Sequence, residues 1–195
     1  WDNCPTPKAG LSHPAAHHLR GVMRHWMCLH GNPICLNMRH FPAPILDRKI
    51  RFALVGCGRI AKNHFASLRT HQERAELVDV CDVDPAALAA AVAETGAKGH
   101  SNLTALLAQT TADIVILTTP SGLHPEQAIE IAASNRHVMT EKPMATRWHD
   151  GLRMVKACDE AAVRMFVVKQ NRRNDTLQLL KRAVYQNRFG RIYMV

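Results

Sequence analysis

The sequence lacks any apolar stretch close to the roughly 20 residues that a helix needs to cross a bilayer. Its first residues also lack the order of basic start, apolar core and small-residue cleavage site that marks a secretory leader. Both absences argue against a membrane protein and against a secreted one. We therefore expect a soluble, cytoplasmic protein.

Paired cysteines are missing as well. The six cysteines, at positions 4, 28, 35, 57, 81 and 158, include no C-x-x-C, so reduced thiols are expected rather than a disulfide framework. The alternative is a zinc site in the first 49 residues, where the potential ligands are His13, His17, His18, His25, Cys28, His30, Cys35 and His40. Pro14 interrupts a helix that would align His13 with His17, and no ligand pair has the usual spacing. No metal site is predicted.

A dense basic run is also absent, although the net charge is +9. Residues 1–49 carry +4 of this charge and residues 50–195 carry +5. The arginines in "NRRND" and "KRAVYQNR" have the pattern of loop and helix-surface positions. Because the positive charge is dispersed, a solvated surface is favoured over a nucleic-acid interface.

Two regions differ in character. Residues 1–48 are rich in proline, histidine and cysteine and show no sustained helical or strand period, so we predict a disordered arm. From residue 50 onward, apolar runs alternate with helical patterns. Strands are expected at 51–56, 76–83, 112–120, 137–143 and 164–170, and helices at 60–70, 85–96, 124–135 and 148–162. This alternation predicts an α/β domain at 49–170, a Rossmann-type doubly wound parallel sheet with helices on both faces.

A glycine turn follows the first expected strand. Gly56, Gly58 and Ala61 form G-x-G-x-x-A between that strand and a helix, a pattern that lets a backbone approach a pyrophosphate at a helix N-terminus. The second strand ends in Asp82, 26 residues after Gly56, near the spacing of an acid that binds the adenine ribose. A carboxylate accepts hydrogen bonds from a 2′-hydroxyl and repels a 2′-phosphate. The predicted cofactor is therefore NAD rather than NADP.

Two further segments lie where strands end. In open parallel sheets, ligands bind beyond the carboxyl ends of the strands. The segments "TTPSGLH" (118–124) and "TEKP" (140–143) both occupy such ends, so Lys142 is expected to point toward the cofactor. An isolated Glu-Lys-Pro would more often be a solvated strand end. The surrounding motifs favour a functional lysine.

The three motifs in this order resemble the Gfo/Idh/MocA family of oxidoreductases over about residues 50–195. The resemblance implies that Lys142 lies between nicotinamide and substrate, where it orients a hydroxyl and shares in proton transfer. Pro143 would fix the lysine backbone, often through a cis peptide bond. The implied cofactor contacts are Gly56, Gly58, Arg59 and Ile60 along the pyrophosphate, Asp82 at the ribose, Thr118, Pro120 and His124 on the nicotinamide side, and Glu141 beside the lysine.

A narrower likeness lies in residues 167–195, which look like the WlbA-type branch of the family. Members of this branch oxidise the 3-hydroxyl of UDP-N-acetylglucosaminuronic acid in bacterial surface-polysaccharide (lipopolysaccharide) synthesis. The likeness implies a UDP-sugar substrate near Asn171, Arg172, Arg173 and Asn174, and a homo-oligomer in the full-length enzyme. The alternative interpretation of the arginines is an exposed loop that only aids solubility.

The family also has a second, mostly antiparallel sheet domain that supplies a catalytic histidine. This sequence stops at Val195, so residues 171–195 are expected to begin a truncated substrate domain, and the chain alone is expected to lack turnover. The alternative function is a non-catalytic NAD-binding or regulatory module. Lys142 discriminates between the two functions, because a module that only binds NAD has no need of it.

Overall fold

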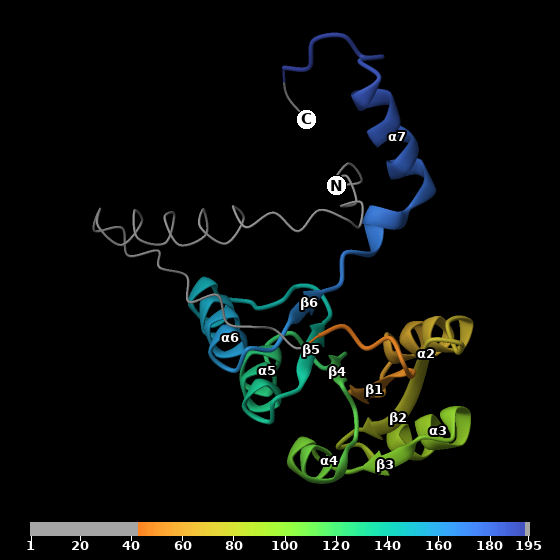
Figure 1. Ribbon diagram of the computed structural model, residues 1–195, viewed down its shortest axis with the longest axis vertical. Helices are drawn as coiled ribbons and strands as arrows, with labels where there is room; N and C mark the ends of the chain where they lie inside the picture. The colour runs from red at the N-terminus through yellow and green to blue at the C-terminus, as the bar shows by residue number, and fades with distance from the viewer. Residues whose placement is uncertain (1–42, 194–195) are drawn as a thin grey trace, which may run out of the picture. The chain divides into compact units, whose positions relative to one another are not determined.

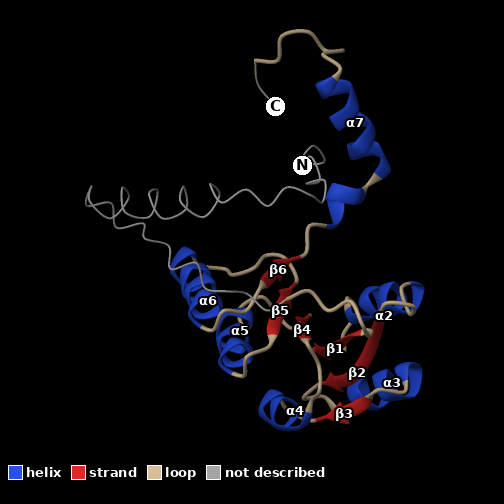
Figure 2. Cartoon of the chain, viewed as in Figure 1, coloured by secondary structure: helices blue, strands red, loops and turns tan. Residues whose placement is uncertain are grey.

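A computed structural model describes residues 43–193 of the chain. The predicted disordered arm at 1–48 and the zinc alternative therefore lie almost wholly outside the described residues. Within 43–49 there is no helix or strand, and the fold begins with β1 at Ile50–Val55. Figures 1 and 2 show the alternation of strands and helices that follows.

One parallel sheet of six strands organises the fold, in the order β3-β2-β1-β4-β5-β6. The strands after β1 are β2 (Ala75–Cys81), β3 (Lys98–His100), β4 (Ile114–Leu117), β5 (His137–Thr140) and β6 (Met165–Val167). The central strands are the most apolar: every residue of β4 is buried, as are the last four of β1. The Rossmann-type doubly wound sheet is confirmed.

Helices cover both faces of this sheet (Figure 1). On one face, α2 (Ala61–Thr70) and α3 (Pro85–Thr95) bury Phe65 and Ala91 against Leu54 and Ile116. On the other face lie α4 (Leu103–Gln109), α5 (His124–Ala133) and α6 (Trp148–Glu160). These three pack Leu106, Ile131 and Met154 against the sheet. The buried side chains on both faces hold the strand ends in fixed positions.

Most expected elements are confirmed; β1 has the predicted length of six residues, whereas β2, β4, β5 and β6 are shorter than predicted. Residues 97–111 had no predicted element and contain β3 and α4. In "RIYMV" (191–195) a terminal strand was expected, but the described residues 191–193 form none. No strand of the described sheet pairs with them, and an unpaired strand leaves its backbone groups without partners. No helix in the described range 43–193 is long and apolar enough to span a membrane.

The chain after β6 forms a short 3-10 turn, η1 (Gln170–Arg173), and an amphipathic helix, α7 (Asp175–Tyr185). Asn174 caps α7 by accepting hydrogen bonds from the amides of Thr176 (3.1 Å) and Leu177 (3.3 Å). None of the residues of α7 is buried. The helix therefore forms from local signals, with its apolar side chains still exposed.

An ion pair at the amino ends of the strands joins the segment before β1 to the segment before β4. The guanidinium of Arg48 donates to both carboxylate oxygens of Asp113, at 2.7 and 2.8 Å, and the amide of Arg51 donates to the same carboxylate at 2.8 Å. Burial alone would raise the pKa of Asp113, but these hydrogen bonds and the charges of both arginines outweigh it and hold the pKa below 3.8. The segment before β1 is thereby tied to the start of β4.

This ion pair predicts a stability change with pH. Because the pKa of Asp113 is lower in the folded chain, its contribution is complete above the unfolded value of about 3.9 and is lost as the pH falls through the folded value. We expect Asp113→Asn to cost about 1–2 kcal/mol of unfolding free energy near pH 7, with the difference shrinking below about pH 4. Urea melts at several pH values measure this. Glu94→Gln, which removes an exposed pair with Arg69 at 3.8 Å, serves as the matched control and should change little.

Candidate cofactor and substrate site

The predicted site residues gather at the carboxyl edge of the sheet, where β1, β4 and β5 end side by side. Gly56 follows β1, Thr118 follows β4, and Glu141 and Lys142 follow β5. The strand order reverses between β1 and β4, because β2 lies on the other side of β1. Ligands bind open α/β sheets at such a switch point.

Gly56 is required by the close approach of two loops. Its φ is +97°, and a Cβ at this position would lie 2.8 Å from the backbone nitrogen of Thr119 and 2.9 Å from the carbonyl carbon of Thr118. The Thr118 hydroxyl donates to the Gly56 carbonyl at 2.6 Å, and the Gly56 amide donates to the carbonyl of Cys81 at 2.8 Å. The glycine turn is thus packed directly against the loop after β4.

The N-terminus of α2 is open to an anion. No side chain caps it, and its first turn contains no acidic residue. The amides of Ala61 and Asn63 donate to the carbonyls of Gly58 and Ile60, each at 3.1 Å, so no carboxylate of the protein competes with an anion there. Gly58 and Arg59 beside it are exposed, and no atom would lie within 4 Å of a Cβ on Gly58. Ala61 is fully buried, as expected for the position where helix and strand pack closely. These features fit a pyrophosphate.

Asp82 stands at the end of β2, beside the glycine turn. Its carboxylate accepts hydrogen bonds from the amides of Cys57 at 2.6 Å and Asp84 at 2.8 Å, and its own amide donates to the carbonyl of His100 at 3.2 Å. An ionised carboxylate has about four acceptor positions. Two of them are used here, so the oriented carboxylate retains capacity for the two hydroxyls of a ribose.

Cys57, within the turn, is not a nucleophile. Burial, followed by the nearby charge of Asp82, raises the pKa of its thiol to about 12. Burial also raises the pKa values of Cys81 and Cys158 to about 11. A thiol that stays protonated near neutral pH is a weak nucleophile. Cys57 and Cys81 therefore act as small apolar residues.

His124 is buried behind the edge rather than exposed on it. Its Nε2 lies 2.9 Å from the carbonyl of Thr119, and its Nδ1 lies 3.0 Å from the hydroxyl of Thr140 and 3.2 Å from the carbonyl of Pro143. The ring has no exposed surface, and it joins the loop after β4 to the one after β5. The contact of His124 with the nicotinamide side stays a prediction. Pro120 of the first loop is exposed, and Thr118 is half-buried.

The Glu-Lys-Pro segment leaves the sheet at the end of β5. The Glu141 amide still pairs with the carbonyl of Leu117 at 3.0 Å, and the Lys142–Pro143 peptide bond is cis, as the resemblance implied. The side chain of Lys142 is exposed, and among residues 43–193 its ammonium has no hydrogen-bond or ion-pair partner. The lysine is therefore available to a ligand at the edge.

One residue at this edge was not predicted from the sequence. His64, in the first turns of α2, lies with its Nε2 2.9 Å from Oε1 of Glu141, and both side chains are mostly buried. The two residues are 77 positions apart in the chain. The pair could have been predicted only by placing the first turn of a helix that starts at residue 61 and the end of β5 at the same edge of the sheet.

The segment Asn171–Asn174 is exposed throughout and lies in and just after η1. Asn174 is used as the helix cap of α7, and the carbonyl of Arg172 accepts a hydrogen bond from the side-chain amide of Gln178. The guanidiniums of Arg172 and Arg173 have no carboxylate partner within the described part of the chain. These two side chains remain available to an anion.

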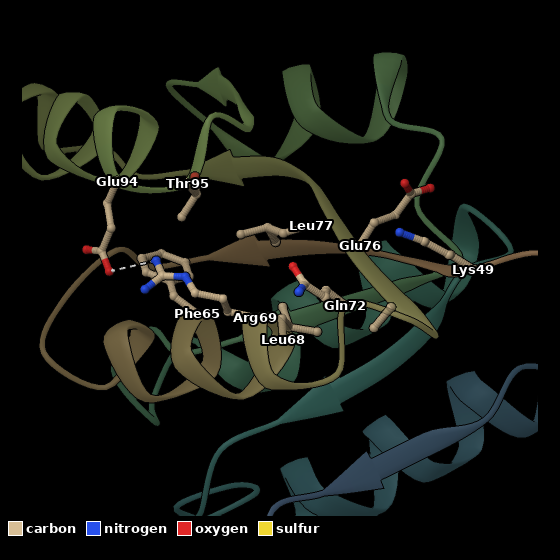
Figure 3. A pocket seen from close by; sticks show the side chains of 10 residues that line it. Lys49, Phe65, Leu68, Arg69, Gln72, Glu76, Leu77, Glu94 and Thr95 are labelled. Atoms are coloured by element: carbon tan, nitrogen blue, oxygen red, sulfur yellow. Dashed lines mark ion pairs between the residues drawn. The ribbon is translucent and has the colours of Figure 1, made fainter.

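A cavity of about 300 Å³ lies elsewhere, between α2 and α3 (Figure 3). Its floor is apolar, with Phe65 and Leu77, and Arg69 and Glu94 form an ion pair at its rim. Lys49 and Glu76 place it at the amino ends of β1 and β2. The cavity is therefore at the opposite end of the strands from the predicted site.

The described residues contain no group of three or more His, Cys, Asp or Glu side chains arranged to hold a metal.

Comparison with known proteins places these features in a family. Residues 50–169 match the sequence profile of the Gfo/Idh/MocA group, described as an oxidoreductase family with an NAD-binding Rossmann fold. The inositol 2-dehydrogenase 2 of Saccharopolyspora erythraea is 30% identical over 148 residues, which is 75% of this chain and 44% of that protein.

Two solved structures are much more similar. The WlbA dehydrogenase of Chromobacterium violaceum, crystallised with NADH and UDP-GlcNAcA, is 72% identical with a TM-score of 0.76, over 80% of this chain and 45% of that one. The WlbA dehydrogenase of Bordetella pertussis, in complex with the same two ligands, is 68% identical with a TM-score of 0.74, over 77% and 44%. The chain thus spans about half the length of the relatives that it matches.

Proposed function

Because this chain belongs to the Gfo/Idh/MocA family of oxidoreductases, whose Rossmann fold binds NAD, we propose that it is the nucleotide-binding half of an NAD-dependent dehydrogenase. The proposed substrate is a UDP-sugar such as UDP-N-acetylglucosaminuronic acid, oxidised at the C3 hydroxyl. The observation that carries this proposal is the 72% identity to a WlbA dehydrogenase crystallised with NADH and UDP-GlcNAcA. Residues 49–170 form the proposed NAD-binding domain, and residues 171–195 the start of the substrate domain.

The cofactor residues have separate roles in this proposal. The amides at the start of α2, with Gly58 and Arg59, bind the pyrophosphate, and Ile60 lines the same turn. Asp82 accepts hydrogen bonds from the adenine ribose. Thr118 and Pro120 would line the nicotinamide side, where NAD, when bound, would supply the acceptor for a hydride from the sugar carbon.

The substrate residues act by charge and by hydrogen bonding. Lys142 orients the reacting hydroxyl and holds or passes its proton at Nζ. Arg172 and Arg173 bind the UDP diphosphate, since a guanidinium forms paired hydrogen bonds with phosphate oxygens. Residues 164–195 contain eight Lys or Arg and one acidic residue, a balance that favours such a doubly charged group.

The test is NADH formation from NAD and UDP-N-acetylglucosaminuronic acid, followed by absorbance. We expect none from the 195-residue chain, which offers Lys142 without a second domain to hold the sugar. A chain extended with the second half of the Chromobacterium violaceum relative should be active. Turnover by the 195-residue chain would mean that the catalytic base does not come from the second domain. NAD binding without turnover in the extended chain would favour the non-catalytic module.

Asp82 should determine which dinucleotide binds. Its carboxylate is held between the amides of Cys57 and Asp84, so it is not free to turn away from a 2′-phosphate. We expect NAD to bind at least about tenfold more tightly than NADP, with Asp82→Ser narrowing the gap. Titration calorimetry with both dinucleotides measures the ratio. A preference of the unaltered chain for NADP would contradict the assignment of Asp82.

We further propose that the enzyme acts in the cytoplasm in bacterial surface-polysaccharide synthesis, as a homo-oligomer in its full length. The nucleotide-activated sugar bound by the WlbA relatives supports this pathway. Exposed apolar side chains on α7, among them Leu179 and Tyr185, support burial against further protein. Nucleic acid is not a proposed partner.

A further inference from the structure

Glu141 and Lys142 are neighbours of opposite charge, yet they do not form an ion pair with each other. Oε1 of Glu141 accepts a hydrogen bond from Nε2–H of His64 at 2.9 Å. Oε2 accepts one from the backbone amide of Lys142 at 3.2 Å. Both carboxylate oxygens are therefore engaged, one by a helix from the far side of the glycine turn and one by the lysine backbone.

Among the described residues, the ammonium of Lys142 therefore has no carboxylate partner. Lys142 is exposed, whereas the side chains of His64 and Glu141 retain only 13% and 17% of their exposure. Within residues 43–193 the only carboxylate next to Lys142 in sequence is turned inward, away from solvent. The site thus combines a satisfied, mostly buried glutamate with an unpaired, accessible ammonium.

We infer that His64 is a positioning residue, which keeps the carboxylate of Glu141 turned away from the ammonium of Lys142. The functional meaning of this inference rests on the proposed role of Lys142 in orienting a hydroxyl and sharing in its proton transfer. An ammonium that donates to its own neighbour has fewer hydrogen bonds to offer a substrate. His64 thereby links the helix of the cofactor turn to the reactive side chain.

Removal of the histidine releases one oxygen of Glu141. A lysine has four methylenes and a flexible ammonium, so the freed carboxylate and the ammonium can approach each other at the protein surface. Exposed pairs of this kind are weak. They are nevertheless strong enough to reduce the chemical reactivity of an amine by a small, measurable factor.

The experiment is acetylation of Lys142 by a limiting amount of an N-hydroxysuccinimide ester at constant pH, with the rate read by mass spectrometry. We expect His64→Phe, which fills the space but donates no hydrogen bond to Glu141, to slow labelling about two- to fivefold. His64→Gln, which can still donate, should keep the rate close to that of the unaltered chain. The double variant His64→Phe/Glu141→Gln should also recover, because it has no carboxylate to pair with the lysine.

This rescue separates positioning from a general structural effect, since loss of packing at residue 64 would not be repaired by a change at Glu141. His64→Ala provides a second variant, with thermal melts to confirm that both are folded at the labelling temperature. Unchanged labelling in folded His64→Phe and His64→Ala overturns the inference, as does slow labelling that persists in the double variant. Neither outcome depends on the cofactor. NADH fluorescence titration of the unaltered chain tests the proposed function separately.

Discussion

Replacement of Lys142 by alanine should lower hydride transfer about 10²- to 10⁴-fold in the chain extended with a second domain. The fold should not suffer, because the side chain is exposed and has no partner within the described residues. NADH affinity of the 195-residue chain should stay within about twofold, since the cofactor is bound mainly by the glycine turn and Asp82 in the proposed arrangement. Stopped-flow absorbance measures the rate and fluorescence titration the affinity.

Two controls sharpen this expectation. Lys142→Arg keeps the positive charge but cannot release a proton near neutral pH, so it should not restore the rate. Lys156→Ala removes an exposed lysine on α6, where it pairs with Glu160 at 3.8 Å, and should leave the rate unchanged. If Lys142→Ala retained most of the rate, another group would have to handle the hydroxyl proton.

Replacement of Gly56 by alanine should be the most damaging single change in the cofactor turn. The added methyl would lie 2.8 Å from the nitrogen of Thr119, and the backbone at φ +97° is unfavourable for any residue with a Cβ. Because the nearest atoms are backbone and cannot rotate away, we expect a loss of about 3 kcal/mol or more in unfolding free energy. Chemical denaturation of the folded chain gives this value directly.

Gly58 and Gly96 are the matched controls. Gly58→Ala meets no atom within 4 Å, so stability should hold while NADH affinity falls, because the methyl occupies the space that the pyrophosphate approaches. Gly96→Ala, at the C-cap of α3 with φ +70° and open surroundings, isolates the cost of the backbone conformation, about 1 kcal/mol. Equal losses at Gly56 and Gly96 would show that the approach of Thr119 does not matter.

The sequence predicted elements well where local patterns and tertiary packing agree. Asp84, Pro85 and Gly96 bound α3 as expected, with the Asp84 side chain accepting from the amide of Ala86 at 2.9 Å. In contrast, β3 consists of Lys98, Gly99 and His100, which have no apolar run, and it is a strand only because β2 offers a free edge. The helix after it has a local signal that was overlooked, since Asn102 caps α4 through the amide of Ala105 at 2.8 Å.

The site was predictable only to the level of which segments meet. Motifs located Gly56, Asp82 and Lys142 at one edge, because parallel strands end together. They could not indicate that His124 is buried, since the same residue type at a strand end serves equally as a ligand or as a support. The contact of His64 with Glu141 joins positions 77 apart and leaves no local pattern in either segment.

The strand order has a consequence for the order in which the chain acquires its structure during synthesis. Strands β1, β2 and β3 are consecutive in sequence and adjacent in the sheet, so they can pair while the rest of the chain is still being made. Phe52 of β1, however, must wait for Ile114 of β4, which leaves the ribosome 62 residues later. Until then, one edge of β1 and the backbone beside Gly56 have no partner. The nucleotide edge is therefore a late product of translation, and the nascent chain exposes an unpaired apolar strand for the time it takes to synthesise those residues.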